Sequence, residues 1–373
     1  MWKLLFPGIA MIAITYSFAR FSFGLFLPSI TDSLALTERQ AGISSSSAYF
    51  AYTLALLTSS SFIRTFGQKR VIQFAGLTAV IGLLLISSSY HFLVLTSGTF
   101  IAGLGSGWAS PAFSQVVVSS LEKKEHDKGN TWINSGTSFG LIVSGPIALL
   151  LTDQWRLAFA FFAFVALIVL IWNSFIIPVK KLEISKVNLF KRSVFVKAKY
   201  LMIASLIMGI GSSIFWTFSR TYLTDQYSMG HQESSFFWVI MGISGVIGGV
   251  AGVVISKLGL RMSYLFAVMV LAASMYLITS SSAPSIYLSA VLFGISYIFL
   301  TGLFIVWGSR EFSNMPALGV SISFLLLGVG QTVGSAIAGE LIQMTSFSFS
   351  FIIFSIICSL GLLVPVKISD LQN

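Results

Sequence analysis

The chain is a succession of twelve apolar segments, and this pattern restricts it to an all-helical membrane protein. Each segment has about 20 residues, the length that an α-helix needs to cross a hydrocarbon core roughly 30 Å thick. Because lipid offers the backbone no hydrogen-bond partners, segments that cross it in this way must be helical. Only 9% of the residues are charged, whereas soluble domains carry about 25%. The predicted helices span residues 4–30, 40–63, 71–89, 93–119, 131–151, 157–177, 200–224, 233–256, 263–280, 285–308, 317–339 and 346–366.

The basic residues are divided unevenly between the two sides of this predicted topology. The formal net charge of +10 is also typical of proteins that bind nucleic acid. With the N-terminus inside, however, the external loops contain only Arg39 and Arg156, and nearly all other Lys and Arg residues fall in inner loops. The positive-inside rule therefore predicts a bacterial plasma (inner) membrane protein with both termini cytoplasmic, and the charge requires no nucleic-acid partner.

A basic segment divides the chain into two halves of similar length. Residues 178–199 are predicted to be a cytoplasmic linker between an N-terminal six-helix bundle, 1–177, and a C-terminal six-helix bundle, 200–373. The lipid bilayer and a small-molecule substrate are the partners that this organisation predicts, and we expect a monomer.

Two short motifs recur in the same order in both halves. The first predicted helix contains YSFAR (Tyr16–Arg20), and the seventh contains WTFSR (Trp216–Arg220). The turn after the second helix contains GQKR (Gly67–Arg70), and the turn after the eighth contains GLR (Gly259–Arg261). The order fits a six-plus-six duplication, which places a substrate site between the halves near the membrane midplane.

These features resemble the major facilitator superfamily over essentially the whole chain. Twelve helices, a basic central loop and the two glycine turns are typical of that family, and the resemblance implies two pseudo-symmetric six-helix bundles. The stretch Ala19–Pro28 is also similar to the YbfB/YjiJ-type branch. The resemblance implies gating loops at Gly67, Lys69, Arg70, Gly259 and Arg261, and an antiporter-like motif at Gly136, Gly140, Gly145 and Pro146.

Three positions depart from the family's pattern. Arg64 and Ser256 stand where the turn motifs usually have an acidic residue, and Thr99 stands where the fourth helix usually has an arginine. Those charges are linked to gating and proton coupling in the family, so the sequence leaves the coupling ion open.

Two arginines, Arg20 and Arg220, fall inside predicted helices. Placing an arginine at the centre of a membrane helix costs about 2.5–3.5 kcal/mol on insertion scales. No acidic residue lies at the middle of a predicted helix, and only Glu340, a possible proton site, approaches one. A guanidinium binds carboxylate or phosphate through paired hydrogen bonds, so the two arginines predict a small organic anion as substrate.

Alternatives to this interpretation remain open. Either arginine can extend toward the membrane surface or bind backbone carbonyls, and Arg220 lies close enough in sequence to reach Asp225. The anion interpretation itself is supported by a resemblance, because phosphate-ester antiporters of the superfamily likewise use arginines from helices one and seven. The antiporter-like motif favours proton-coupled multidrug efflux as the rival function.

Polar and aromatic residues in other helices are further candidates for substrate contact, although each can instead make hydrogen bonds between helices. The sequence has no nucleotide-binding loop, no metal-spaced cluster and no nucleophile beside a histidine. We therefore expect a transporter without cofactor or metal, rather than an enzyme. The predicted substrate-binding residues are Arg20, Arg220, Tyr16, Trp216, Trp108, Gln115, Tyr297 and Gln331.

Overall fold

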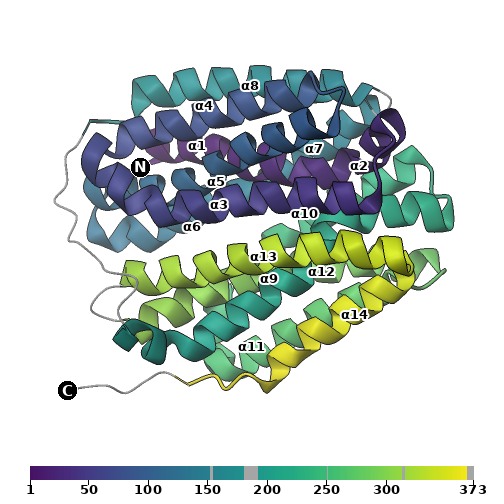
Figure 1. Cartoon of the computed structure of the whole chain (residues 1–373). Coiled ribbons are helices and arrows are strands. Elements are labelled where there is room, and N and C mark those ends of the chain that lie inside the picture. Colours follow the sequence, from purple (N-terminus) through teal and green to yellow (C-terminus); the bar gives the residue numbers. More distant parts are fainter. Residues whose placement is uncertain (152–153, 180–191, 250, 313–315, 368–373) are drawn as a thin grey trace. The chain divides into compact units, whose positions relative to one another are not determined.

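The computed structural model describes residues 1–151, 154–179, 192–249, 251–312 and 316–367, and these ranges are helical apart from short turns (Figure 1). The helices are α1 (Trp2–Ile12), η1 (Ala13–Phe21), α2 (Ser22–Leu34), α3 (Glu38–Phe66), α4 (Gln68–Ser87), α5 (Phe92–Ser120), η2 (Lys123–Glu125), α6 (His126–Asn134), α7 (Gly136–Leu150), α8 (Trp155–Ile176), α9 (Arg192–Tyr227), α10 (His231–Gly248), α11 (Ala251–Leu277), α12 (Ala283–Glu311), α13 (Pro316–Met344), α14 (Phe347–Leu360) and η4 (Gly361–Leu363).

These elements make twelve membrane crossings, as the sequence predicted. Among the described residues, nine helical segments are long and apolar enough to cross a membrane by length and composition. The first of them joins α1, η1 and α2 into one continuous helix. The remaining crossings are α3, α10, and α14 with η4.

Helix α3 is rich in serine, and its hydroxyl groups make hydrogen bonds to α5. Ser44 contacts the Thr96 hydroxyl at 2.9 Å, and Ser47 contacts the Thr99 hydroxyl at 2.8 Å. Thr99 also donates to the carbonyl of Ser44 at 2.9 Å. Small hydroxyl residues let membrane helices pack closely and bond to each other. Thr99, the position where the family that the sequence resembles usually has an arginine, therefore belongs to a packing contact between α3 and α5.

By their internal contacts the residues form two compact units. The first comprises Met1–Ile184 and Trp216–Ile243, and the second comprises Ser185–Phe215 and Ser244–Asn373. The end of α9 and most of α10 therefore pack with helices of the N-terminal half. The predicted division into residues 1–177 and 200–373 stays a prediction.

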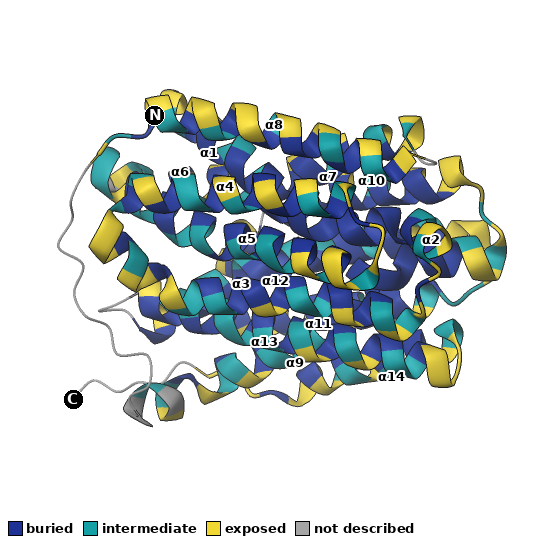
Figure 2. Ribbon diagram, turned by 45° about the horizontal axis from the view of Figure 1, so that its top comes forward, coloured by how far each residue is buried: buried dark blue, intermediate teal, exposed yellow. Residues whose placement is uncertain are grey.

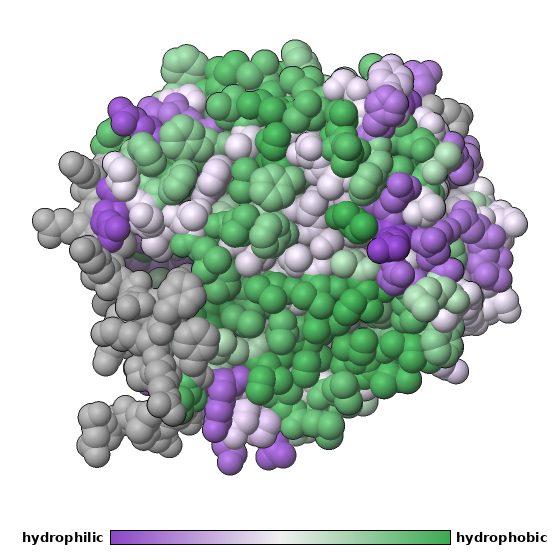
Figure 3. All heavy atoms as spheres, viewed as in Figure 1, coloured by the Kyte–Doolittle hydropathy of each residue, from purple (hydrophilic) through white to green (hydrophobic). Residues whose placement is uncertain are grey.

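In the first unit, α8 has one face toward the core and one apolar face outward (Figure 2). Phe159 and Phe162 are fully buried, whereas Phe164 and Phe175 are exposed. An outward face without polar groups suits contact with lipid. Hydrophobic side chains cover this helix along the upper edge of Figure 3, while hydrophilic ones gather near helix ends.

In the second unit, α9 begins earlier than the seventh helix that the sequence predicted at residues 200–224. The predicted linker, 178–199, lies largely outside the described residues, but residues 192–199 are helical. Ala198 is buried against Phe312, Leu318 and Ile322, and the Lys197 ammonium lies 5.4 Å from the Phe312 ring centroid. Hydropathy did not predict this helical turn, because its basic residues lower the mean hydropathy of the segment. Lysine can still occupy such a helix, since its stem covers apolar surface while its charge remains at the edge.

The two glycine turns predicted from the repeat have nearly the same backbone conformation. Gly67 has φ 81° and ψ 156°, and Gly259 has φ 78° and ψ 162°. Side chains are strained at such positive φ values, so both turns require glycine. Lys69 is half-buried, and Arg70 and Arg261 are exposed.

Candidate substrate site

Arg20 lies in the π-helical segment η1, which interrupts the first membrane helix. The backbone N–H of Ser22 donates to the carbonyl of Ser17, five residues earlier, and the Ser22 hydroxyl donates to the same oxygen at 2.9 Å. The Ser17 hydroxyl donates to the carbonyl of Thr137 on α7 at 2.6 Å. Single-turn π distortions are frequent at functional sites.

Four aromatic rings surround the Arg20 guanidinium. Its central carbon lies 5.1 Å from the ring centroid of Tyr16, 4.6 Å from Phe21, 5.2 Å from Tyr49 and 4.3 Å from Tyr52. Arg20 is 5% exposed, so these cation–π contacts are largely shielded from solvent. A cation–π contact of this kind is worth about 2 kcal/mol or more when it is desolvated. The aromatic cage thus holds a positive charge inside the helix bundle.

The predicted pair Tyr16 and Trp216 borders this cage from two different helices. Phe21 stacks on Trp216 with ring centroids 4.1 Å apart, and Trp216 meets Trp238 of α10 edge-on at 5.9 Å. A Cβ at Gly24 would overlap the Trp216 carbonyl oxygen, so α2 and α9 touch backbone to backbone there. The structure therefore joins Arg20 to the end of α9 through aromatic rings.

Arg220 lies one turn after Trp216 and is fully buried. Its Nη1 donates to the carbonyl of Leu25 on α2, and its Nε donates to Ser234 Oγ on α10 at 3.1 Å. Among the described residues, its Nη2 has no hydrogen-bond partner. Arg220 thus binds a backbone carbonyl through Nη1, which is one of the alternatives that the sequence left open. Asp225 instead accepts a hydrogen bond from Thr224 at 3.1 Å.

The antiporter-like motif is a packing surface of α7. A Cβ at Gly136 would overlap the Ile9 carbonyl oxygen, and one at Gly140 would lie 2.6 Å from Ser17 Cβ. At Gly145 it would overlap a Val239 methyl group, while Pro146 is exposed. These glycines bring α7 against the helix that carries Arg20 and against α10.

Trp108 and Gln115 are not joined to the arginines by any contact described above. Trp108 donates from Nε1 to the Thr58 hydroxyl at 3.0 Å and stacks on Phe62 at 5.2 Å. It lines a hollow of about 300 Å³ together with Phe62, Phe66, Phe74, Leu77 and Thr78. Gln115 is half-buried. A role for either residue in substrate binding stays a prediction.

Tyr297 and Gln331 are brought together in the second unit. Gln331 Nε2 donates to the Tyr297 hydroxyl at 3.0 Å, and both side chains are buried. The pair links α12 to α13, which is the interhelical alternative that the sequence left open. Glu340 is half-buried near the end of α13, and its role in proton coupling stays a prediction.

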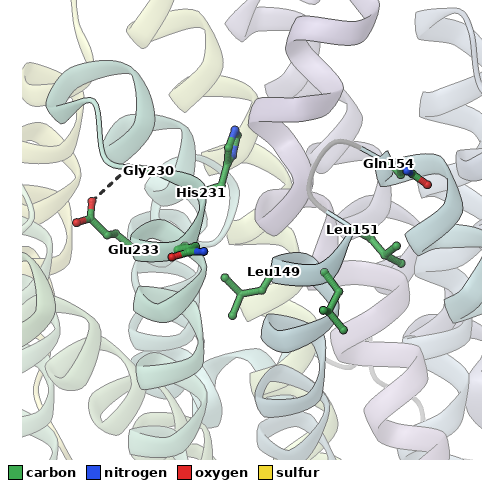
Figure 4. Close-up of a pocket in the computed structure, with 8 residues that line it drawn as sticks. Leu149, Leu151, Gln154, Gly230, His231 and Glu233 are labelled. Atoms are coloured by element: carbon green, nitrogen blue, oxygen red, sulfur yellow. Dashed lines mark hydrogen bonds between the residues drawn. The ribbon is translucent and has the colours of Figure 1, made fainter.

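A larger hollow of about 610 Å³ lies beside the turn between α9 and α10. Leu149 and Leu151 approach it from the end of α7, and His231 and Glu233 approach it from the start of α10 (Figure 4). Glu233 accepts a hydrogen bond from the Gly230 N–H at 3.2 Å. Neither this hollow nor the one beside Trp108 is lined by Arg20 or Arg220.

Sequence reasoning missed Tyr49, Tyr52, Ser234 and Trp238. The two tyrosines stand three residues apart on α3, a spacing that places them on one face of the helix. That spacing indicated an aromatic face on α3, but nothing in the sequence shows that this face packs against Arg20. Ser234 and Trp238, four residues apart on α10, share a face in the same way.

The comparisons with known proteins agree with this architecture. The family model described as Major Facilitator Superfamily matches residues 9–321. A Bacillus subtilis (strain 168) protein named Uncharacterized transporter YybO is 25% identical over 370 residues, which cover 90% of this chain and 79% of the relative. The Hexuronate transporter of the same strain is 23% identical over 360 residues, which cover 87% of this chain and 85% of that protein.

Solved structures show the same fold. The nucleoside transporter NupG has a TM-score of 0.78 at 14% identity, covering 97% of this chain and 98% of its own. The D-xylose-proton symporter has a TM-score of 0.79 at 13% identity, covering 99% of both chains. At these identities the likeness concerns the fold alone. The family match and the relatives named above identify the chain as a membrane transporter that belongs to the Major Facilitator Superfamily.

Proposed function

We propose that the protein is a secondary transporter that moves a small organic anion by alternating access, with Arg20 and Arg220 as the binding residues. One observation carries this proposal: two guanidinium groups are buried in the first unit, Arg20 against the ring of Phe21, which stacks on Trp216, and Arg220 one helical turn after Trp216. Burial removes water from both charges, and a bound anion would replace part of that lost solvation.

The geometry of Arg220 suits an anionic ligand. Its Nη2 is buried and has no hydrogen-bond partner among the described residues, so one donor of the fork is available. A guanidinium binds a carboxylate through two parallel hydrogen bonds, and charge assistance makes these bonds stronger than neutral ones. An anion would use Nη2 directly and would compete with the Leu25 carbonyl for Nη1.

The relatives point in the same direction. A hexuronate is a sugar that carries a carboxylate, and the Hexuronate transporter covers most of this chain. By contrast, nothing specific supports proton-coupled drug efflux. The glycines that suggested it, Gly136, Gly140 and Gly145, pack helices together, which transporters of either kind require.

We further propose a bacterial plasma membrane location with cytoplasmic termini, as the distribution of charge indicates. In this arrangement the protein works as a monomer, with the lipid bilayer and the small anion as its partners.

Uptake into proteoliposomes tests the proposed function. The purified protein should take up or exchange a labelled carboxylate such as galacturonate. Arg20→Ala should reduce the apparent affinity by about 10- to 150-fold, because it removes the binding free energy of one charge-assisted pair. The exposed Lys257→Met serves as a charge-matched control and should transport like the parent. Undiminished uptake by Arg20→Ala, or transport of organic cations alone, would refute the anion proposal.

A further inference from the structure

Several polar side chains where α9 meets α10 are buried without a hydrogen-bond partner. The set comprises Ser219 Oγ, Arg220 Nη2, Thr221 Oγ1, Ser235 Oγ and Trp238 Nε1, none of which is bonded within the described part of the chain. Ser219, Arg220, Ser235 and Trp238 have no exposed surface. All of them belong to the segment that packs with the first unit.

This lack of partners is not a general property of the two helices. Thr224 on α9 donates to the carbonyl of Thr221 at 3.0 Å, and Ser234 on α10 donates to the carbonyl of His231 at 3.3 Å. Hydroxyl groups of membrane helices usually bond in this way. A buried donor or acceptor without a partner costs about 1–3 kcal/mol. The packing seen here therefore carries an unfavourable contribution that a polar ligand would relieve.

Two of these groups belong to the turn of α10 that contacts Trp216 and Arg220. Ser235 and Trp238 stand three residues apart on α10, so their side chains share a face of the helix. The Trp238 ring meets Trp216 edge-on at 5.9 Å, and Ser234, next to Ser235, binds Arg220. One turn of α10 thus carries the indole N–H, the Ser235 hydroxyl and the serine that binds Arg220.

We infer that Ser235 and Trp238, beside Arg220, form a hydroxyl-binding half of the substrate site, and that the substrate is a polyhydroxylated carboxylate such as a sugar acid. The inference rests on the proposed function, in which Arg20 and Arg220 bind the carboxylate. A hydroxyl group both donates and accepts, so several of them on one ring would satisfy the serine hydroxyl and the indole N–H together. An aliphatic or aromatic acid without hydroxyls would leave them unsatisfied.

The site becomes available when α9 moves away from α2. In the packing seen here, the Arg220–Leu25 hydrogen bond and the contact of Gly24 with the Trp216 carbonyl hold the two helices together. Separation breaks that hydrogen bond and frees Nη1. It also lets ligand or water reach the buried donors.

The test compares two carboxylates of similar ring size, galacturonate and cyclohexanecarboxylate, as inhibitors of uptake and as ligands in a binding assay. The measured quantity is the ratio of their affinities for the parent, Trp238→Phe, Ser235→Ala and Trp155→Phe. Trp238→Phe keeps an aromatic ring but removes the N–H. Trp155→Phe is the matched control, because Trp155 is also buried in the first unit with an Nε1 that has no described partner.

The parent should prefer galacturonate, and Trp238→Phe and Ser235→Ala should each lower this preference by about 5- to 10-fold, the value of one hydrogen bond. Trp155→Phe should keep the parent's ratio. An unchanged ratio in both α10 variants, or an equal fall in Trp155→Phe, would overturn the hydroxyl-binding site and leave the anion transporter intact. Binding of neither carboxylate by the parent would overturn both.

Discussion

The guanidinium of Arg220 donates to the backbone carbonyl of Leu25, a residue 195 positions earlier in the chain. A second donor of the same side chain binds Ser234, so one arginine connects α2, α9 and α10. In the proposed mechanism the arginine alternates between two partners. It holds the helices together through the carbonyl, and it binds the anion when they separate.

Replacing Arg220 should therefore affect stability as well as transport. Arg220→Ala loses two charge-assisted hydrogen bonds and leaves the Leu25 carbonyl without this donor, so we expect the free energy of unfolding to fall by about 1.5–3 kcal/mol. Ser234→Ala removes only one acceptor and should cost less. Denaturation in detergent micelles, followed by tryptophan fluorescence, measures both. Equal stability of Arg220→Ala and the parent would show that these bonds do not stabilise the fold.

The contact between Gly24 and α9 gives a second prediction. Gly24→Ala places a methyl group where the Trp216 carbonyl oxygen lies. The backbones would have to separate, so transport should fall and a cysteine at Ser45 should become more reactive toward a small thiol reagent, because Ser45 bonds the Thr217 hydroxyl at 2.8 Å. Gly252→Ala is the control, since a Cβ there meets nothing within 4 Å. Normal transport by Gly24→Ala would contradict the prediction.

The aromatic cage predicts a graded series at position 20. Arg20→Lys keeps the charge and the cation–π attraction but loses the planar fork, so its anion affinity should lie between those of the parent and Arg20→Ala. Tyr52→Phe keeps the ring nearest the guanidinium and should bind more tightly than Tyr52→Leu. Ligand titration by tryptophan fluorescence gives the order. A Lys variant equal to the Ala variant would mean that charge alone contributes little.

Arg156 should stabilise the helix ends in the first unit. Its Nε and Nη2 donate to the Ser89 carbonyl at 3.2 and 2.9 Å, and its Nη1 donates to the Ser33 hydroxyl at 3.0 Å. Its central carbon also lies 4.2 Å from the Trp155 ring centroid. Arg156→Met keeps most of the apolar stem and should lower the free energy of unfolding by about 1.5–3 kcal/mol. Transport at low temperature should persist, because no proposed binding residue is changed.

Labelling of intact cells tests the topology. In a Cys358→Ser background, a membrane-impermeant thiol reagent should modify Gln226→Cys, in the predicted external turn, and should not modify Val179→Cys at the start of the central loop. Both native side chains are exposed, so accessibility from the two sides decides the result. Reaction of Val179→Cys in intact cells, with Gln226→Cys protected, would reverse the orientation.

Hydropathy predicted the helices because lipid imposes a fixed length and an apolar surface on each one. The first helix illustrates the limit: the prediction was 4–30, and the structure has α1 to α2 over residues 2–34. Polar groups at the ends of helices carry little hydropathy signal, so the ends were underestimated. The glycine turns were predictable, since Gly67 and Gly259 each precede a basic residue at the same place in the repeat.

The candidate site was predictable only in part. Arg20 and Arg220 were visible because a charge inside an apolar run is rare. Tyr49 and Tyr52 could not be assigned to Arg20, because which face of α3 meets η1 depends on packing between helices. Trp238 was hidden for a different reason: an indole N–H without a partner becomes apparent only when all neighbouring acceptors are placed.

The π-helical segment that carries Arg20 also has a geometric consequence. A π-helix accommodates one residue more per hydrogen-bonded ring than an α-helix does. If the segment Ala13–Phe21 rewound to α-helix, the surplus residue would shift the register by one position, which is a rotation of about 100°. The part of the helix that follows, α2 with the Leu25 carbonyl, would rotate about the helix axis with little translation along it. A change between π-helix and α-helix in this segment would therefore bring different side chains of the first membrane helix to face α9, without unfolding a turn of the helix.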